Sequence, residues 1–191
     1  MEQKRNLTKK LIAESFEVLM EKHPFEKITI RMITDQAGLI RPTFYNHFQD
    51  KYDLVEWIFC ENIIREVESL LDHGMVQEAI KFLFTGIHRN RQFYSKLLQV
   101  TGQNCLEEVM GRHFYELFRK SIEQRGIKKL PKNRVLNVDT LSHYYTLGLL
   151  TSVKAWLLMG DEDISVDELT EAYEFLLTHS VYDMIDDKPE L

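Results

Sequence analysis

The sequence predicts an all-α fold of about nine helices, in which a small N-terminal three-helix head precedes a larger helical domain. Apolar residues recur three and four positions apart along most of the chain, which is the period of an α-helix. Four prolines and eight glycines among 191 residues leave little room for a strand-rich fold. We place the boundary between the two parts after residue 52, giving domains 1–52 and 53–191.

The first helix is expected to run from about Leu7 to Lys22. Three glutamates face away from its apolar stripe, as in an amphipathic helix that covers a core. Pro24 then ends the helix, and Phe25 is expected to pack under the head. The stripe consists of Leu11, Ile12, Phe16, Leu19 and Met20.

Residues 28–54 are expected to form two short helices joined by a tight turn. Thr29 is a natural N-cap, and Gly38 suits the position with positive φ that ends a helix. Pro42 then fits the first turn of the second helix, where its missing N–H is no loss. The outer face of this second helix carries hydrogen-bond donors suited to phosphates and base edges, namely Arg41, Thr43, Tyr45 and His47.

This segment resembles the helix-turn-helix of the TetR family of transcription regulators, in the pattern A-G-x-x-x-x-T-F-Y-x-H-F-x-x-K-x-x-L. Ile40 departs from the family pattern, because a small capping residue, usually Ser, is common at that position. The residues that carry the resemblance are Thr29, Arg31, Ala37, Gly38, Pro42, Thr43, Phe44, Tyr45, His47, Phe48, Lys51 and Leu54.

The resemblance implies that the segment binds duplex DNA. It places five residues on the DNA backbone: Thr29, Thr43, Tyr45, His47 and Lys51. It places three residues nearest the base edges: Arg31, Arg41 and Pro42. The alternative is structural, with Tyr45 leaning on the first helix, Arg41 solvated and His47 buried and satisfied.

Charge alone supports DNA binding only weakly. The net charge is −6, but residues 1–53 hold nine Lys and Arg against eight Asp and Glu, and the remainder holds fifteen against twenty-two. Affinity is therefore expected to come from placed contacts and from two half-sites in a dimer. Four basic residues near the start either touch a neighbouring phosphate or form a solvated helix end: Lys4, Arg5, Lys9 and Lys10.

Nothing in the chain suggests secretion, membrane insertion or a bound cofactor. The first ten residues lack an apolar signal region, and the longest apolar stretch is interrupted at Lys154. Cys60 and Cys105 form no C-x-x-C pair and are expected to be buried thiols. We therefore expect a cytoplasmic protein without a cofactor.

A long helix is expected to join the head to the second domain. Asp50 caps it, and it runs from Lys51 to about Leu71 before Gly74. A shift along this helix would change the spacing of two recognition helices in a dimer.

Helices separated by turns follow from Met75 onward. Asn104 with Glu107 resembles a capping box for a helix that Gly126 ends, and Ser165 with Glu168 resembles a second one. The penultimate helix is expected over Val135–Met159, with Gly160 after it, and the last over Val166 to about Ile185.

The last two helices are the expected dimer interface. The penultimate helix is apolar nearly all round, so more than one of its faces must be covered. Two such helices from each subunit would form a four-helix bundle, and the dimer would read two half-sites about 34–36 Å apart. The alternative is that one chain buries both helices by itself.

The region from about Asn90 to Glu168 resembles the subgroup of the TetR family that contains DhaS-type regulators. The resemblance lies in RQFYSKLL, in the helix ending AWLLMG and in ISVDEL. It implies an activator of a dihydroxyacetone kinase operon that works with a kinase-like co-activator protein.

Aromatic residues and a histidine between the helices could line an effector pocket, although such residues more often form core. Two pairs at helical spacing, His113 with Glu116 and Asp139 with His143, supply too few ligands for a metal site. The pocket candidates are Phe82, His88, Tyr94, Phe114, Tyr115, Tyr144 and Trp156.

Two other function classes compete with a DNA-binding regulator. An enzyme is disfavoured because no P-loop, dinucleotide turn, H-E-x-x-H or nucleophile elbow occurs, and Ser142 and His143 point apart on one helix. A helical protein-interaction adaptor remains open, and salt-dependent binding to duplex DNA distinguishes it from a regulator.

Overall fold

The computed structural model describes residues 2–126, 134–158, 164–180 and 183–184, and every regular element within these ranges is helical. A π-helical segment, Cys60–Ile64, joins α4 and α5 into one continuous rod, so the described elements form nine α-helical bodies, as the sequence predicts. A short 3₁₀ turn, Phe25–Lys27, follows the first helix. The helices are α1 (Glu2–Lys22), α2 (Ile30–Gln36), α3 (Arg41–Tyr45), α4 (Lys51–Phe59), α5 (Arg65–Asp72), α6 (Val76–Arg89), α7 (Arg91–Leu98), α8 (Leu106–Arg125), α9 (Val138–Leu158) and α10 (Val166–Thr178).

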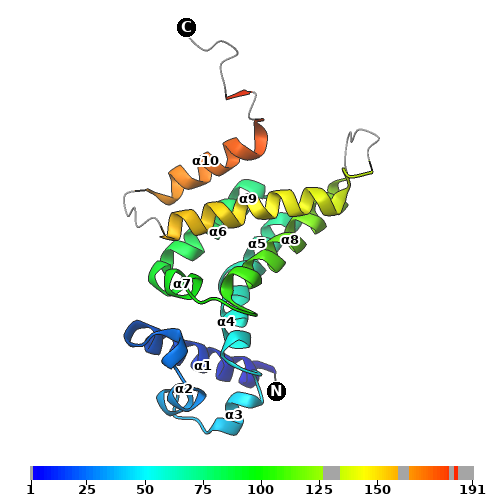
Figure 1. Ribbon diagram of the computed structural model, residues 1–191. Coiled ribbons are helices and arrows are strands. Elements are labelled where there is room, and N and C mark those ends of the chain that lie inside the picture. Colours follow the sequence, from blue (N-terminus) through cyan, green and yellow to red (C-terminus); the bar gives the residue numbers. More distant parts are fainter. Residues whose placement is uncertain (1, 127–133, 159–163, 181–182, 185–191) are drawn as a thin grey trace.

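Helices α1, α2 and α3 form the head at one end of the molecule (Figure 1). The Thr29 side chain accepts a hydrogen bond from the Met32 N–H at 3.2 Å, which confirms the predicted N-cap of α2. Gly38 has φ +65°, a conformation that a side chain would strain, so it closes α2 as expected. The head core is aromatic, with Phe44 and Phe48 almost fully buried.

Helix α1 begins at Glu2, earlier than the predicted Leu7, and ends at Lys22 as predicted. Phe25 is buried, and its ring meets those of Phe16 and Tyr52 edge-on at 6.2 and 4.9 Å between centroids. Phe25 is therefore packed between α1 and the start of α4, and its burial agrees with the predicted packing under the head.

The rod formed by α4, the π-helical segment and α5 leads from the head into the core (Figure 1). Asp50 caps it by accepting hydrogen bonds from the N–H groups of Tyr52 and Asp53 at 2.7 and 2.9 Å. The π-helical segment was not predicted. Helix α6 approaches it so closely that a Cβ on Gly86 would lie 3.0 Å from Ile63 Cγ1.

Two helix ends in the core differ from the sequence prediction. The Asn104–Glu107 capping box is wrong, because Cys105 is the N-cap of α8 and makes no side-chain bond. Asn104 instead adopts φ +61°, and its N–H donates to Glu108 Oε2 at 2.8 Å. The Ser165–Glu168 capping box is confirmed.

The last two helices are shorter than predicted. Helix α10 ends at Thr178 because His179 has an extended backbone, with φ −120° and ψ 146°. Helix α9 begins at Val138 and is described to Leu158. The predicted positions at Met159, Gly160 and Ile185 lie outside the described residues.

One apolar core runs through the molecule, from the head along the rod to the face shared by α8 and α9. Helix α10 packs on α6, and α10 lies at the end of the molecule opposite to the head (Figure 1). Among the described helices, none combines the length and the apolar character that crossing a membrane requires.

Candidate nucleic-acid interface

Helix α3 is held from beneath by one buried ring. Phe44 is fully buried and packs against Phe48 with 5.6 Å between ring centroids. Ile40 is the N-cap and makes no side-chain bond, as its departure from the family pattern predicted, while Pro42 occupies the first turn. With its inner face fixed in this way, the outer face of α3 is free to contact a ligand.

The residues expected nearest the base edges, Arg31, Arg41 and Pro42, are all exposed. Arg31 Nε lies 3.5 Å from Asp35 Oδ2 in an ion pair whose side chains are 81% and 67% exposed. Arg41 Nη2 donates to the Tyr45 hydroxyl at 3.5 Å. Exposed and long contacts of this kind contribute little to stability, so both guanidinium groups can exchange them for nucleic acid at small cost.

His47 lies in the turn after α3, which ends at Tyr45, and not on the outer face of that helix as predicted; it is half-buried, and its Nδ1 atom is buried without a hydrogen-bond partner. Burial lowers the pKa of His47, and the nearby charges of Arg5 and Lys9 lower it further. Lys9 Nζ also lies 5.3 Å from the Phe48 ring centroid and 5.5 Å from that of Trp57. The start of α1 therefore brings two basic residues, Arg5 and Lys9, beside His47.

Lys51 has a structural role that the sequence did not reveal. Its Nζ donates to the carbonyl oxygens of Phe25 and Ile28 at 2.7 and 3.2 Å, and it lies 4.1 Å from the Phe25 ring centroid. Burial lowers its pKa. Because an ammonium has three N–H donors, one remains for the backbone contact that the family resemblance implies.

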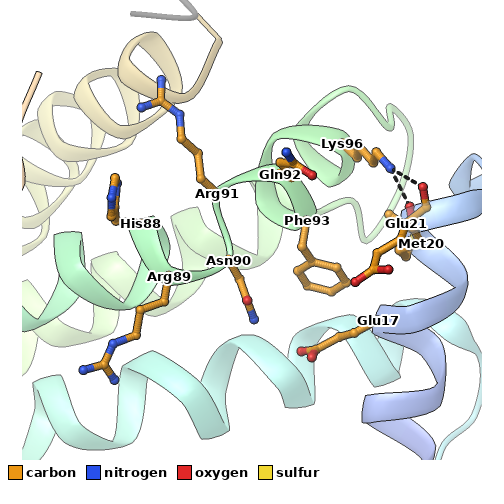
Figure 2. Close-up of a pocket in the computed structure, with 10 residues that line it drawn as sticks. All are labelled: Glu17, Met20, Glu21, His88, Arg89, Asn90, Arg91, Gln92, Phe93 and Lys96. Atoms are coloured by element: carbon orange, nitrogen blue, oxygen red, sulfur yellow. Dashed lines mark hydrogen bonds between the residues drawn. The ribbon is translucent and has the colours of Figure 1, made fainter. Parts of the chain in front are cut away.

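A cleft of about 360 Å³ lies where α1 of the head meets α6 and α7 of the core (Figure 2). Lys96 Nζ crosses this joint and donates to the carbonyl oxygens of Met20 and Glu21 at 2.7 and 3.1 Å. A cation at the end of α1 also complements the helix dipole. Burial raises the pKa of Glu17 on the facing side, and Glu14 adds to this shift.

Figure 2 shows that Arg89 and Arg91 extend from the cleft in opposite directions, so their charges do not converge on one point. Arg91 Nη2 donates to the Trp156 carbonyl oxygen at 3.0 Å. The cleft is therefore better described as the joint between head and core than as an anion site.

The seven effector-pocket candidates are not gathered around one cavity. Phe114 lines an apolar cavity in the core, and His88 lines the joint and stacks on Trp156 at 6.0 Å between ring centroids. Tyr115 donates its hydroxyl hydrogen to Asp139 Oδ1 at 2.9 Å, away from the other candidates. The rest are two buried residues, Tyr94 and Trp156, one half-buried residue, Phe82, and one exposed residue, Tyr144.

A polar cluster links the rod to α8. Cys60 Sγ lies 3.2 Å from His113 Nε2, which lies 3.0 Å from Glu56 Oε1, and Arg112 Nη2 donates to Glu56 Oε2 at 2.8 Å. Burial raises the pKa of the Cys60 thiol to about 11, and the Glu56 charge contributes. This thiol is therefore protonated at neutral pH.

Within the described ranges, no three side chains of His, Cys, Asp or Glu are grouped as a metal site requires.

Helices α9 and α10 expose apolar side chains along one stripe each. On α9 these include Tyr144 and Leu147, which are 70% and 62% exposed, and on α10 they include Phe175 and Leu176. The inner faces of the same helices are already buried in the core. A single chain therefore leaves this stripe uncovered, against the alternative that it buries both helices alone.

Two protein-family models match parts of this chain. A family model described as "Bacterial regulatory proteins, tetR family" matches residues 12–58, from the middle of α1 through α2 and α3 to near the end of α4. A second, described as "Transcriptional regulator C-terminal region", matches residues 75–178.

One curated relative is the HTH-type dhaKLM operon transcriptional activator DhaS of Lactococcus lactis, which is 30% identical over 94 residues. The match covers 49% of this chain and spans about half the length of that relative, 50%.

Two solved structures show the same fold. The dihydroxyacetone kinase operon activator DhaS has a TM-score of 0.66 at 23% identity, with 89% of this chain and 93% of that chain covered. The fatty acid degradation regulator FadR from Bacillus halodurans has a TM-score of 0.58 at 17% identity, with 90% and 95% covered.

Proposed function

Because this chain belongs to the TetR family of bacterial transcriptional regulators, we propose that it binds a palindromic DNA operator as a homodimer and controls transcription of the adjacent genes. The observation that carries this proposal is the exposed outer face of α3, where Arg41, Pro42 and Tyr45 stand on a helix fixed by the buried Phe44. A short helix with exposed donors can enter the major groove.

We assign contacts to the head by the chemistry of each side chain. Arg31, Arg41 and Pro42 lie nearest base edges, and an arginine suits the paired acceptors of guanine. The other five residues fix the register on phosphates, with Lys51 using its remaining N–H: Thr29, Thr43, Tyr45, His47 and Lys51. Residues 1–52 form the DNA-binding domain and residues 53–191 the regulatory and dimerisation domain.

The exposed stripes on α9 and α10 support the dimer. On α9, the exposed Tyr144 and Leu147 lie three positions apart, and a Cβ built on the neighbouring Gly148 would meet no atom within 4 Å. A small residue on such a stripe permits close approach of a partner helix. Pairing α9 and α10 with a second copy would cover the apolar surface in a four-helix bundle.

In this proposal, a small molecule or a partner protein binds to the core and changes the affinity of the head for DNA. The two DhaS proteins named above are operon activators, which favours activation in this proposal. A co-activator protein, which the family resemblance implies, is the second mode. The rod that joins head and core supplies the mechanical link for either mode.

We propose no catalytic role and place the protein in the cytoplasm, where bacterial DNA is found. The named relatives are regulators. Ser142 Oγ donates to the Val138 carbonyl oxygen, and His143 Nδ1 contacts the Asp139 carbonyl oxygen, so each is engaged with its own helix rather than with the other.

Retardation of labelled random duplex DNA by the full-length protein tests the proposal against the adaptor alternative. A regulator that makes several phosphate contacts loses roughly 10³- to 10⁵-fold in affinity between about 50 and 200 mM salt. An adaptor leaves the duplex unretarded even at low salt, and that result would overturn the proposal.

A further inference from the structure

An apolar cavity of about 100 Å³, partly open to solvent, lies between α5, α6, α8, α9 and α10. Its wall is formed almost entirely by aliphatic and aromatic side chains, among them Leu83 of α6, Phe114 of α8 and Leu149 of α9. No Lys, Arg, His, Asp or Glu lines it within the described residues. A charged molecule would therefore lose its hydration there without gaining a counter-charge.

One buried polar group on this wall lacks a partner. Tyr173 of α10 lines the cavity and is 7% exposed, and its hydroxyl oxygen is buried without a hydrogen bond. The ring itself is fixed edge-on to Phe84 at 6.0 Å between centroids. Burial raises the pKa of this hydroxyl, with a smaller contribution from Tyr145, so it remains an O–H donor at neutral pH.

A buried hydroxyl without a partner is costly, and a native structure rarely leaves one unsatisfied. A water molecule is a poor occupant, because it needs two to four polar partners and this wall offers few. The hydroxyl of Ser121 is the other polar side-chain group that lines the cavity in the described part of the chain. A molecule with one acceptor and an apolar body satisfies both the hydroxyl and the wall.

The volume limits the size of that molecule. A cavity of about 150 Å³ lined by Leu, Ile and Phe holds benzene, which has six carbon atoms. The space here is about two thirds as large, so it suits four or five heavy atoms. The lack of a cation on the wall disfavours a carboxylate as the ligand, and the unpartnered hydroxyl donor of Tyr173 favours a carbonyl or alcohol oxygen.

We propose that this cavity binds a neutral short-chain ketone, aldehyde or alcohol whose oxygen accepts a hydrogen bond from Tyr173. Ligand binding itself does not depend on the proposed function, but the effect of the ligand on dimer pairing does. Helix α10 contributes Tyr173 to the cavity and Phe175 and Leu176 to the exposed stripe. A ligand that fixes Tyr173 therefore biases the helix that pairs with the second subunit.

Ligand-observed NMR titration of the full-length protein with 2-butanone, and separately with cyclopentane, tests the proposal. Both probes have five heavy atoms, but only 2-butanone carries an acceptor. The wild type is expected to bind both at millimolar concentration. Tyr173→Phe removes one hydrogen bond, so it should weaken 2-butanone about 5- to 10-fold and leave cyclopentane within about twofold.

Ala79→Leu adds three carbon atoms at the cavity wall and should abolish binding of both probes. Ala172→Leu makes the same change at an exposed position of α10 and should leave both affinities unchanged. Wild-type protein that binds neither probe, or Tyr173→Phe that binds 2-butanone as tightly as the wild type, would overturn the inference.

Duplex retardation by the same preparations, with and without 2-butanone, separates this inference from the proposed function. Protein that retards DNA but does not bind 2-butanone overturns the ligand inference alone. Protein that binds 2-butanone but does not retard DNA supports the cavity and overturns the regulator proposal.

Discussion

The head and the core differ in what their exposed surfaces offer. On the head, α2 and α3 expose arginines and a tyrosine hydroxyl in weak contacts with one another, such as that of Arg41 with Tyr45 at 3.5 Å. On the core, α9 and α10 expose large apolar side chains such as Leu147 and Leu176. The first surface suits a polyanion and the second suits another apolar surface, so DNA binding and dimerisation should be separable by mutation.

Phe44→Ala should give the largest effect, and it should be confined to the head. The ring is fully buried, and removal of such a ring costs about 3–5 kcal/mol in lost burial and cavity formation. DNA retardation should be lost while sedimentation still shows a dimer. The matched variant Phe84→Ala removes an equally buried ring from the core and should weaken the dimer. Loss of the dimer in Phe44→Ala would show that the two regions are not separable.

Leu147→Glu should break the dimer with little change in the helical content of the monomer. The position is 62% exposed in one chain, and burial of an unpaired carboxylate in an interface costs roughly 3 kcal/mol, or about 100-fold in the dissociation constant. Analytical ultracentrifugation measures this change. Leu7→Glu alters a leucine that is 69% exposed on the head and should leave the dimer intact. An unchanged dissociation constant in Leu147→Glu would place the interface elsewhere.

Arg41→Ala should weaken binding to a specific site by about 1–3 kcal/mol if the guanidinium reads a base. Binding to random duplex should change much less, and fluorescence anisotropy with both duplexes measures the difference. Arg89→Ala removes the same charge from the core, far along the chain from α3, and serves as the control. An equal loss on specific and random DNA would make Arg41 a phosphate contact instead.

His47 should make the stability of the head depend on pH, with the smallest effect of the four. Its pKa is lowered in the folded protein, so the unfolded chain binds the proton more readily. The stabilisation is complete above about pH 6.5, the unfolded value, and is lost as the pH falls through the lower folded value. Urea unfolding between about pH 5 and 7 should show this slope in the wild type and a flatter one in His47→Gln. Equal slopes would exclude His47 as its source.

Much of the head could be predicted from the sequence because local chemistry determines it. Thr29, Gly38, Pro42 and Asp50 each act through their own neighbouring backbone, and the structure confirms each cap and turn. The core helices were also predicted, but some of their ends differ in the structure. Asn104 was predicted as an N-cap, whereas it adopts the left-handed conformation and the N-cap is Cys105.

Contacts between distant segments could not be predicted, because the spacing of apolar residues along the sequence does not indicate which segments meet. Lys51 resembles a DNA contact in sequence, yet two carbonyl groups from the loop before α2 hold its ammonium. Lys96 gave no signal at all and crosses the joint to the end of α1. The predicted pocket residues lie at separate sites for the same reason. Helical spacing shows which residues share one face of a helix, but it does not show which other helix packs against that face.

Selection of random duplexes by the purified full-length protein, followed by sequencing of the retained DNA, tests the central claim most directly. We expect an inverted repeat whose half-sites lie about one helical turn apart, because two α3 helices related by a two-fold axis would read successive major grooves. Retained DNA with no enriched sequence at low salt would contradict it, and would leave the exposed α9 and α10 surface as the functional site of the chain.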